Sequence, residues 1–263
     1  MLRMLRVEGR RTVQSLALWI IFGVMVVVSF WFSGMTFAKF PEEISAAYGM
    51  QYGTATPMSR GEYVFLRTMS DASFTAWLSV IAGALLIGME FSNRTINHLI
   101  YAGNRRISIL VVKLLYFYLC TLFLSAVYPV ASCFRYSLTW FSGLTQSDVA
   151  YVLRCVGCRT LIDMAMMSFA LVSAFAFRDV IRTLVCSLII VVVLSQLMNI
   201  VRGVGNGALI KNMIDYFPAL TINKIMFRDA SVENIRRSML YSCTMILSTW
   251  ISCHLFFRKA NLK

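Results

Sequence analysis

Long apolar runs separated by short polar connections dominate the chain. A helix needs about 20 mostly apolar residues to cross the hydrocarbon core of a bilayer, and the runs approach or reach that length. They do not alternate as barrel strands do, and helices satisfy their own backbone hydrogen bonds in lipid. We therefore predict an all-α integral membrane protein with a single transmembrane domain, residues 1–263. Its six transmembrane helices are expected at about 15–35, 72–90, 107–134, 157–177, 183–202 and 238–257.

The fourth predicted span has the weakest apolar pattern. Its apolar core at 164–177 is too short alone and must extend back past Asp163 and Arg159. One interpretation is an intramembrane polar patch with Arg154 that lines a substrate path, where Arg159 and Asp163 pair at i,i+4 spacing. The other is that the span begins later and these residues lie at the level of the lipid headgroups. The sequence leaves both open.

Composition supports the membrane assignment. Apolar residues make up 59% of the chain and charged residues 14%, against about a quarter in soluble domains. The mean hydropathy is +0.70. A net charge of +13 would suggest nucleic acid in a soluble protein. Here the lysines and arginines lie mostly at the ends of spans, so we expect the lipid bilayer and not nucleic acid as the partner.

The same charges predict an orientation. Four arginines precede the first span, which favours a cytoplasmic N-terminus by the positive-inside rule. Six spans then place Arg94, Arg105, Arg106 and the C-terminus in the cytoplasm, as expected for a multi-pass protein of the plasma membrane. The segment 202–237 is basic although it would lie outside. Its apolar positions at 209–217 predict an amphipathic helix at the outer interface.

The polar connector at 90–106 has its apolar residues Ile96, Leu99 and Ile100 at roughly helical spacing. It is either a short amphipathic coupling helix on the inner surface, acting as a lever on a partner, or an ordinary loop whose arginines fix orientation. Lys113 lies about two turns inside the third span. It either extends to the inner headgroups or forms a salt bridge to Glu90 that fixes the connector against the bundle. It is also a candidate member of the intramembrane polar patch.

These residues carry a family resemblance. Glu90 at the end of the second span, Arg94-Thr95-Ile96, Asn104-Arg105-Arg106 and Lys113 resemble the coupling segment of ABC-2 type transporter permeases. Residues 1–14, with Glu8, resemble the short basic interfacial helix with which that family opens. The chain departs from the pattern at Arg94, where glycine is common. It also has Tyr101-Ala102-Gly103 where the family commonly has a turn with proline. It looks closest to permeases of bacteriocin or antibiotic export and immunity systems.

The resemblance implies a permease subunit that exports an amphipathic or peptide-like compound. It would pair with a second permease subunit, alike or different, and with cytoplasmic ABC ATPase subunits that bind ATP and Mg²⁺. This chain lacks GxxxxGK[ST], so we expect neither an enzyme nor a cofactor site in it. The alternative is a non-transporting membrane anchor or sensor that recruits a cytoplasmic partner. The residues expected to couple to the ATPase are Glu90, Arg94, Thr95, Ile96, Asn97, Arg105 and Arg106, with Glu8 and Arg11 as further members.

Other chemistry has weak support. Seven cysteines at irregular spacing do not form a disulfide framework, and Cys155-Val156-Gly157-Cys158 has no second pair for a zinc site. The HExxH motif is absent. A serine–histidine dyad with His254 would join opposite ends of the spans, so no catalytic or metal-binding residues are expected.

Overall fold

The computed structural model describes most of the chain and is almost entirely helical. The described residues are 2–37, 43–44, 58–70, 81, 84–136, 145–203, 222, 225–226 and 230–258. The elements are α1 (Leu2–Gln14), α2 (Leu16–Phe37), β1 (Glu43–Ile44), β2 (Met58–Ser59), α4 (Arg60–Ser70), a π-helical turn η1 (Ala84–Gly88), α6 (Met89–Ser92), α7 (Thr95–Tyr101), α8 (Arg106–Tyr136), α10 (Gln146–Phe177), α11 (Val180–Gly203) and α14 (Val232–Arg258). The two short strands pair antiparallel.

Three of the described helices are long and apolar enough to cross a membrane: α8, α10 and α14. Shorter apolar stretches lie within α2, at Leu18–Trp31, and within α11, at Val180–Ile190. The described residues are thus helical as predicted and include three candidate membrane spans, while the count of six spans stays a prediction. Most of the predicted span at 72–90, and all of the predicted amphipathic helix at 209–217, lie outside the described residues.

The helix of the fourth predicted span starts earlier than its apolar pattern suggested. α10 begins at Gln146, ahead of the predicted start at 157, and runs unbroken to Phe177. Its first turn is fixed by a capping box. The Asp148 backbone N–H donates to Thr145 Oγ1, and the Thr145 N–H donates to the Asp148 carboxylate. Arg159 and Asp163 consequently lie in mid-helix, both at most 4% exposed.

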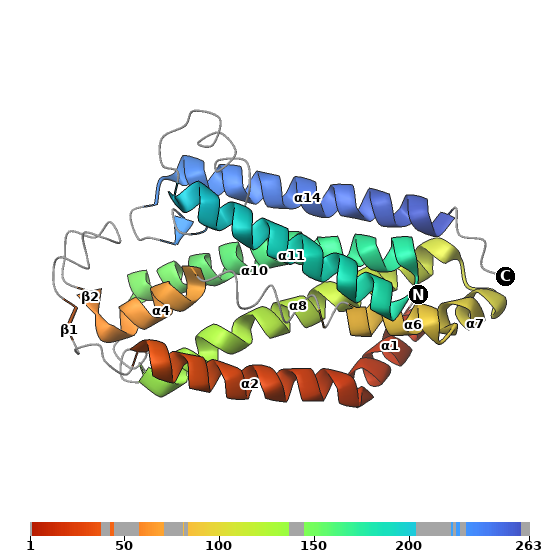
Figure 1. Ribbon diagram of the computed structural model, residues 1–263, viewed down its shortest axis with the longest axis horizontal. Coiled ribbons are helices and arrows are strands. Elements are labelled where there is room, and N and C mark those ends of the chain that lie inside the picture. Colours follow the sequence, from red (N-terminus) through yellow and green to blue (C-terminus); the bar gives the residue numbers. More distant parts are fainter. Residues whose placement is uncertain are drawn as a thin grey trace.

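The long helices run alongside one another between two ends of the molecule (Figure 1). One end, here called the connector end, contains α1, α6, α7 and the last turn of α14; α4 lies at the opposite end. Two contacts close the connector end. Arg106 donates to the carbonyls of Phe257 and Arg258 at 3.3 Å, and the Val180 N–H donates to Ser92 Oγ at 3.3 Å. The segments predicted to be cytoplasmic are thus gathered at one end.

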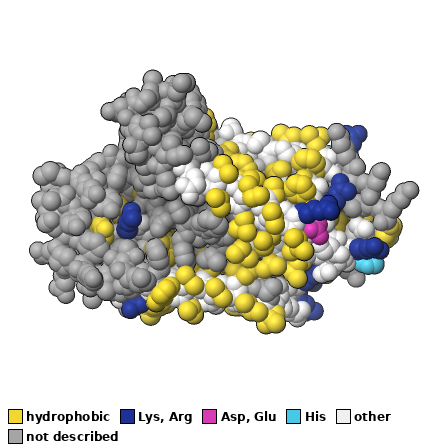
Figure 2. All heavy atoms as spheres, viewed as in Figure 1, with side chains coloured by type: hydrophobic (Ala, Val, Ile, Leu, Met, Phe, Trp, Pro, Cys, Tyr) yellow, Lys and Arg dark blue, Asp and Glu magenta, His cyan; other side chains and the backbone are white. Residues whose placement is uncertain are grey.

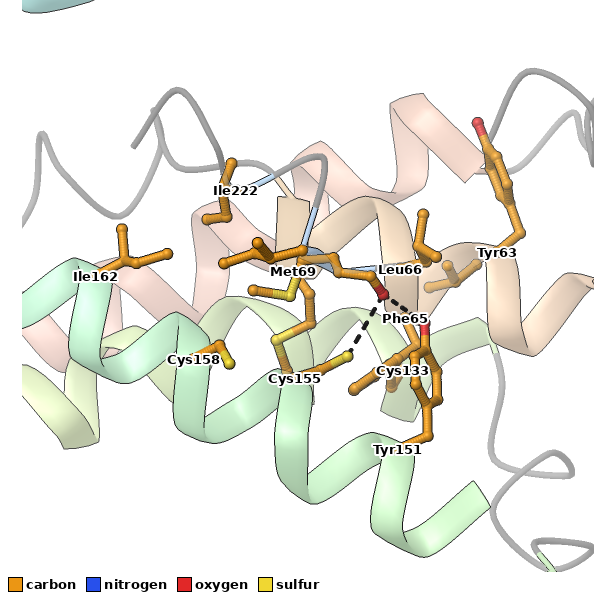
Figure 3. Close-up of a cluster of buried hydrophobic side chains, with 13 residues drawn as sticks. Tyr63, Phe65, Leu66, Met69, Cys133, Tyr151, Cys155, Cys158, Ile162 and Ile222 are labelled. Atoms are coloured by element: carbon orange, nitrogen blue, oxygen red, sulfur yellow. Dashed lines mark hydrogen bonds between the residues drawn. The ribbon is translucent and has the colours of Figure 1, made fainter. Parts of the chain in front are cut away.

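Two main groups of buried side chains hold the helices together. The connector-end core includes Ile96 of α7, Leu114 of α8, Phe175 of α10 and Phe257 of α14. Its rings meet edge-on: Phe175 lies 5.3 Å from Phe91 and 5.7 Å from Phe257 between centroids. The second group, the α4-end core, joins α4 to α8 and α10 (Figure 3).

The surface of the molecule also differs between its middle and its connector end. In Figure 2, apolar side chains cover the middle of the visible face, and several Lys and Arg side chains gather toward the connector end. Large apolar residues such as Ile181 and Val193 of α11 and Leu247 of α14 are at least half exposed. An apolar belt with charges at its end is the surface expected of a helical membrane protein.

Candidate functional site

The connector forms a short helix, as the first of the two interpretations required. α6 ends at Ser92, a turn at Asn93 and Arg94 follows, and α7 occupies Thr95–Tyr101. Arg94 has a φ of 55°, in the left-handed region. Glycine reaches that region without steric cost, whereas a residue with a Cβ is strained there. This is a physical reason for the glycine that is common at this step in the family the segment resembles.

α7 turns its apolar face inward. Ile96 is completely buried in the connector-end core, and Leu99 and Ile100 pack against that core. The amide of Asn104 donates to the Leu99 carbonyl at 2.9 Å and closes the C-terminal end of the helix. Because the apolar residues contact the chain's own bundle, a partner would meet the other side of α7, where His98 and Tyr101 are exposed.

A buried ion network lies beneath the start of this helix. Lys113 Nζ is 2.5 Å from Glu90 Oε1 and 2.7 Å from Glu8 Oε1. Lys113 is 4% exposed and Glu8 6% exposed, so both have left water almost entirely. Of the two alternatives for Lys113, the structure has the salt bridge to Glu90. The second carboxylate, from α1, was not foreseen as its partner.

Arg11 extends the network to the connector helix. Its guanidinium lies 3.6 Å from Glu90 Oε1 and donates to Thr95 Oγ1 at 3.3 Å. Arg11 is about half exposed, so it is the one member of the network that solvent reaches freely. The four charges, two of each sign, join α1, α6 and α8 in one group, and the Thr95 contact adds α7.

α1 is fixed in this position by a second contact with α8. Tyr116 Oη donates to the Leu5 carbonyl at 2.5 Å. The close approach depends on Gly9, because a Cβ at that position would lie 2.6 Å from Tyr116 Oη. The helix that carries Glu8 and Arg11 therefore rests directly on α8.

A cavity of about 150 Å³ borders the network. Its polar lining comes from Glu8, Arg11, Ser15, Glu90 and Asn93, and leucines, Ile21 and Met89 complete it. Glu90 Oε2 is buried without a hydrogen-bond partner among the described residues. The group contains carboxylates and cations in equal number, which suits it to fixing helices relative to one another rather than to bond-making chemistry.

The remaining connector residues lie around this group. Arg105 is exposed, and Arg106 binds carbonyls at the C-terminus of α14, where the helix dipole favours a cation. Asn97 is half-buried in α7. The structure thus brings Glu8, Arg11, Glu90, Thr95 and Lys113 into direct contact and leaves Arg105 on the surface nearby.

The predicted intramembrane charges separate into two groups. Lys113 belongs to the network at the connector end, whereas Arg159 and Asp163 lie against α4. Arg159 Nε is 2.8 Å from Asp163 Oδ2, and its Nη1 donates to the Thr68 and Met69 carbonyls at 3.4 and 2.5 Å. Arg159 therefore caps the C-terminus of α4. Arg154 lies over the Tyr151 ring, 5.4 Å from its centroid.

The cysteines and histidines in the described part of the chain form no group of metal ligands. Cys155 and Cys158 are buried in the α4-end core, and Cys155 Sγ is 3.5 Å from the Met226 carbonyl (Figure 3). Within the described ranges, no three or more His, Cys, Asp or Glu residues are grouped so as to hold a metal ion. His254 is half-buried near the end of α14.

No protein-family model matches the chain. The curated proteins contain no match to it either. The resemblance to ABC-2 permeases therefore rests on the residues of the connector, the N-terminal helix and the layout of the apolar runs.

Proposed function

We propose that this chain is the permease subunit of an ATP-driven ABC exporter of the plasma membrane, in which the connector helix α7 receives movement from a separate ATPase. The observation that carries the proposal is the buried network of Glu8, Glu90 and Lys113. It attaches the base of a short surface helix to α8, one of the long apolar helices. An ordinary loop would not require a buried, ion-paired base.

The mechanical argument follows from how α7 is attached. Its apolar face, led by Ile96, is seated in the connector-end core, and its first residue, Thr95, is held by Arg11. Packed cores are close to crystalline density and shift between arrangements instead of deforming continuously. A partner that displaces α7 would therefore move α8 and α1 together with it.

The energy source has to be external to this chain. The sequence contains no P-loop, so ATP and Mg²⁺ would be bound by a cytoplasmic ATPase subunit. The polar side of the connector, with Arg94, His98, Tyr101 and Arg105 exposed, is the surface we assign to that subunit. Together with the three long helices, α2, α11 and the 72–90 segment would make six spans. Six spans would place both termini and this surface in the cytoplasm. A second permease subunit would complete the path for an amphipathic or peptide-like compound.

The first experiment is to tag the chain at its C-terminus, extract it from its native host in mild detergent and identify what co-purifies. A stoichiometric subunit with a P-loop is expected. If it is absent under conditions that preserve ABC complexes, the exporter proposal fails, and a membrane anchor or sensor becomes the better assignment.

The second experiment tests the network in the purified complex. Glu90→Gln keeps the size of the side chain and removes its charge. We expect substrate-stimulated ATP turnover to fall at least tenfold while the complex still assembles. The matched control is Glu233→Gln, which breaks exposed pairs of Glu233 with Arg236 and Arg237 at the start of α14. Equal turnover in both variants would contradict a coupling role for Glu90.

A further inference from the structure

A second feature of the connector end is an apolar cavity on the outer side of α1, α2 and α8. Its volume is about 280 Å³, and its lining includes Val13, Trp19, Tyr116, Leu119 and Phe123. Leu119 and Phe123 are about half exposed, so the cavity opens to the surface of the bundle. A groove of about 380 Å³ lies between α2 and α8, and Phe123 lines both hollows. The two hollows together are here called the apolar channel along α8.

The α1 edge of this channel is cationic. Gly9 and Val13 line the cavity. Along α1, Arg6 is three residues before Gly9, and Arg10 is three residues before Val13. Residues at these spacings share one side of a helix. Both arginines are exposed, and neither forms an ion pair with any residue that the structure describes. Glu8 and Arg11 point to the opposite side, into the buried network.

Nothing on the same helices neutralises these two arginines. Glu8 is the one acidic residue within α1, α2 and α8, and it is occupied by Lys113. A second copy of the chain placed symmetrically against this face would bring its own arginines to the same level, where like charges repel. The occupant that fits is therefore apolar along the channel and anionic at the α1 end.

Trp19 marks the level at which the apolar part begins. Its indole N–H donates to the Val13 carbonyl at 2.7 Å, and half of the side chain is exposed. Tryptophan prefers the boundary between headgroups and hydrocarbon. An acyl chain in the cavity would therefore have its headgroup level with Arg6 and Arg10.

We infer that the channel between α1, α2 and α8 is a binding site for an anionic phospholipid, with its phosphate on Arg6 and Arg10 and one acyl chain beside Trp19 and Phe123. Basic residues at the membrane surface attract anionic lipids, and buried methylenes add affinity along the chain. The site is independent of the proposed transport function. A lipid held there would bridge α1 to the α2–α8 face and support the helix that carries Glu8.

Quenching of Trp19 by brominated lipids tests the site. The full-length protein is reconstituted in phosphatidylcholine vesicles that contain a fixed minor fraction of phosphatidylglycerol with brominated acyl chains. The Trp19 signal is obtained by subtracting the emission of Trp19→Phe. We expect stronger quenching by brominated phosphatidylglycerol than by brominated phosphatidylcholine at the same fraction. Arg6→Gln with Arg10→Gln should lower that preference about fivefold for each arginine.

Two further variants define the site. Arg182→Gln removes an exposed arginine from α11, which does not line the channel, and should leave the preference unchanged. Cys120→Phe places a larger side chain in the cavity and should reduce quenching. Equal quenching by the two lipids, or a preference that survives loss of both arginines, would overturn the inference. The inference would also be overturned if neither brominated lipid quenched Trp19 and a Phe123→Cys variant cross-linked neighbouring copies of the chain. That result would mean that a second copy covers this face.

Discussion

Lys113 is the residue whose replacement tests the buried network most directly. It lies within 2.7 Å of the carboxylates of both Glu8 and Glu90, and all three side chains are nearly or mostly buried. Lys113→Met keeps an unbranched apolar stem and removes the cation. Two carboxylates would then face each other in a site with little water. Arg11, 3.6 Å from Glu90 and half exposed, would be the remaining cation of the network.

The expected loss of folding stability in Lys113→Met follows from these contacts. Removing one partner of a buried ion pair costs about 3–5 kcal/mol, because the other charge stays buried. Arg11 remains beside Glu90, so we place Lys113→Met at the lower end, about 3 kcal/mol. For chains of about 150–250 residues, 1 kcal/mol corresponds to about 2–4 °C in Tm. The apparent Tm should therefore fall by about 6–12 °C.

A triple variant separates charge from packing. Glu8→Gln, Lys113→Met and Glu90→Gln together leave no charge of the network buried. Replacing all members of a buried ion group is often close to neutral, so most of the Tm should return. If the triple variant is no more stable than Lys113→Met alone, the loss comes from packing and the electrostatic reasoning is refuted.

The assay is thermal unfolding of the full-length protein in one detergent, followed by reaction of buried thiols with a fluorogenic dye. Cys158 and Cys253 are buried and report unfolding, while Cys243 is exposed and sets the starting signal. Arg182→Met, which removes an exposed cation from the start of α11, is the control and should stay within about 1 °C of the parent. A shift below about 2 °C for Lys113→Met would also refute the argument.

The remaining predictions use the same unfolding assay. Arg94→Gly should retain or slightly raise the Tm, because glycine adopts the left-handed backbone conformation of this position without strain. Arg94→Val should lower the Tm by several degrees. Equal Tm values for the two variants would contradict backbone strain at this turn. Gly9→Ala should lower the Tm by about 2–4 °C by displacing Tyr116, and should cost little in a Tyr116→Phe background. Arg159→Leu should cost about 3–5 kcal/mol, partly recovered by adding Asp163→Leu; no recovery would mean that the α4 carbonyls, not the ion pair, dominate.

The helices were predictable wherever an apolar run is long enough to cross a bilayer. The observed α8, at 106–136, and α14, at 232–258, lie close to the predicted spans because their apolar runs exceed what a bilayer requires. The start of α10 was missed for a physical reason. Residues 146–156 are too polar to be recognised as membrane helix, but a capping box nucleates the helix at Thr145 regardless of hydropathy.

At the candidate site, local relations were predictable, whereas of the tertiary contacts the Lys113–Glu90 pair was anticipated, as one of two alternatives. The Arg159–Asp163 pair follows from i,i+4 spacing, and the short helix at the connector follows from the spacing of its apolar residues. The carbonyls of α4 bound by Arg159, and the placement of Glu8 against Lys113, depend on how segments distant in the chain pack. A buried lysine needs a partner, but the sequence alone does not say that Glu8 and Glu90 both provide one.

The two ends of the molecule are joined by helices that belong to both cores. α8 contributes Leu114 to the connector-end core and Cys133 to the α4-end core, and α10 contributes Phe175 and Tyr151 in the same way. Pro129 lies in α8 close to Cys133. Because proline has no backbone N–H, it interrupts the helical hydrogen bonds there. α8 can therefore bend near the α4-end core, whereas α10 is continuous and transmits displacement along its whole length. α4 packs mainly against α8, and α10 holds it by Arg159. A movement imposed on α7 would therefore reach α4 through both helices of this packed pair, with the two buried ion groups as fixed points toward its two ends.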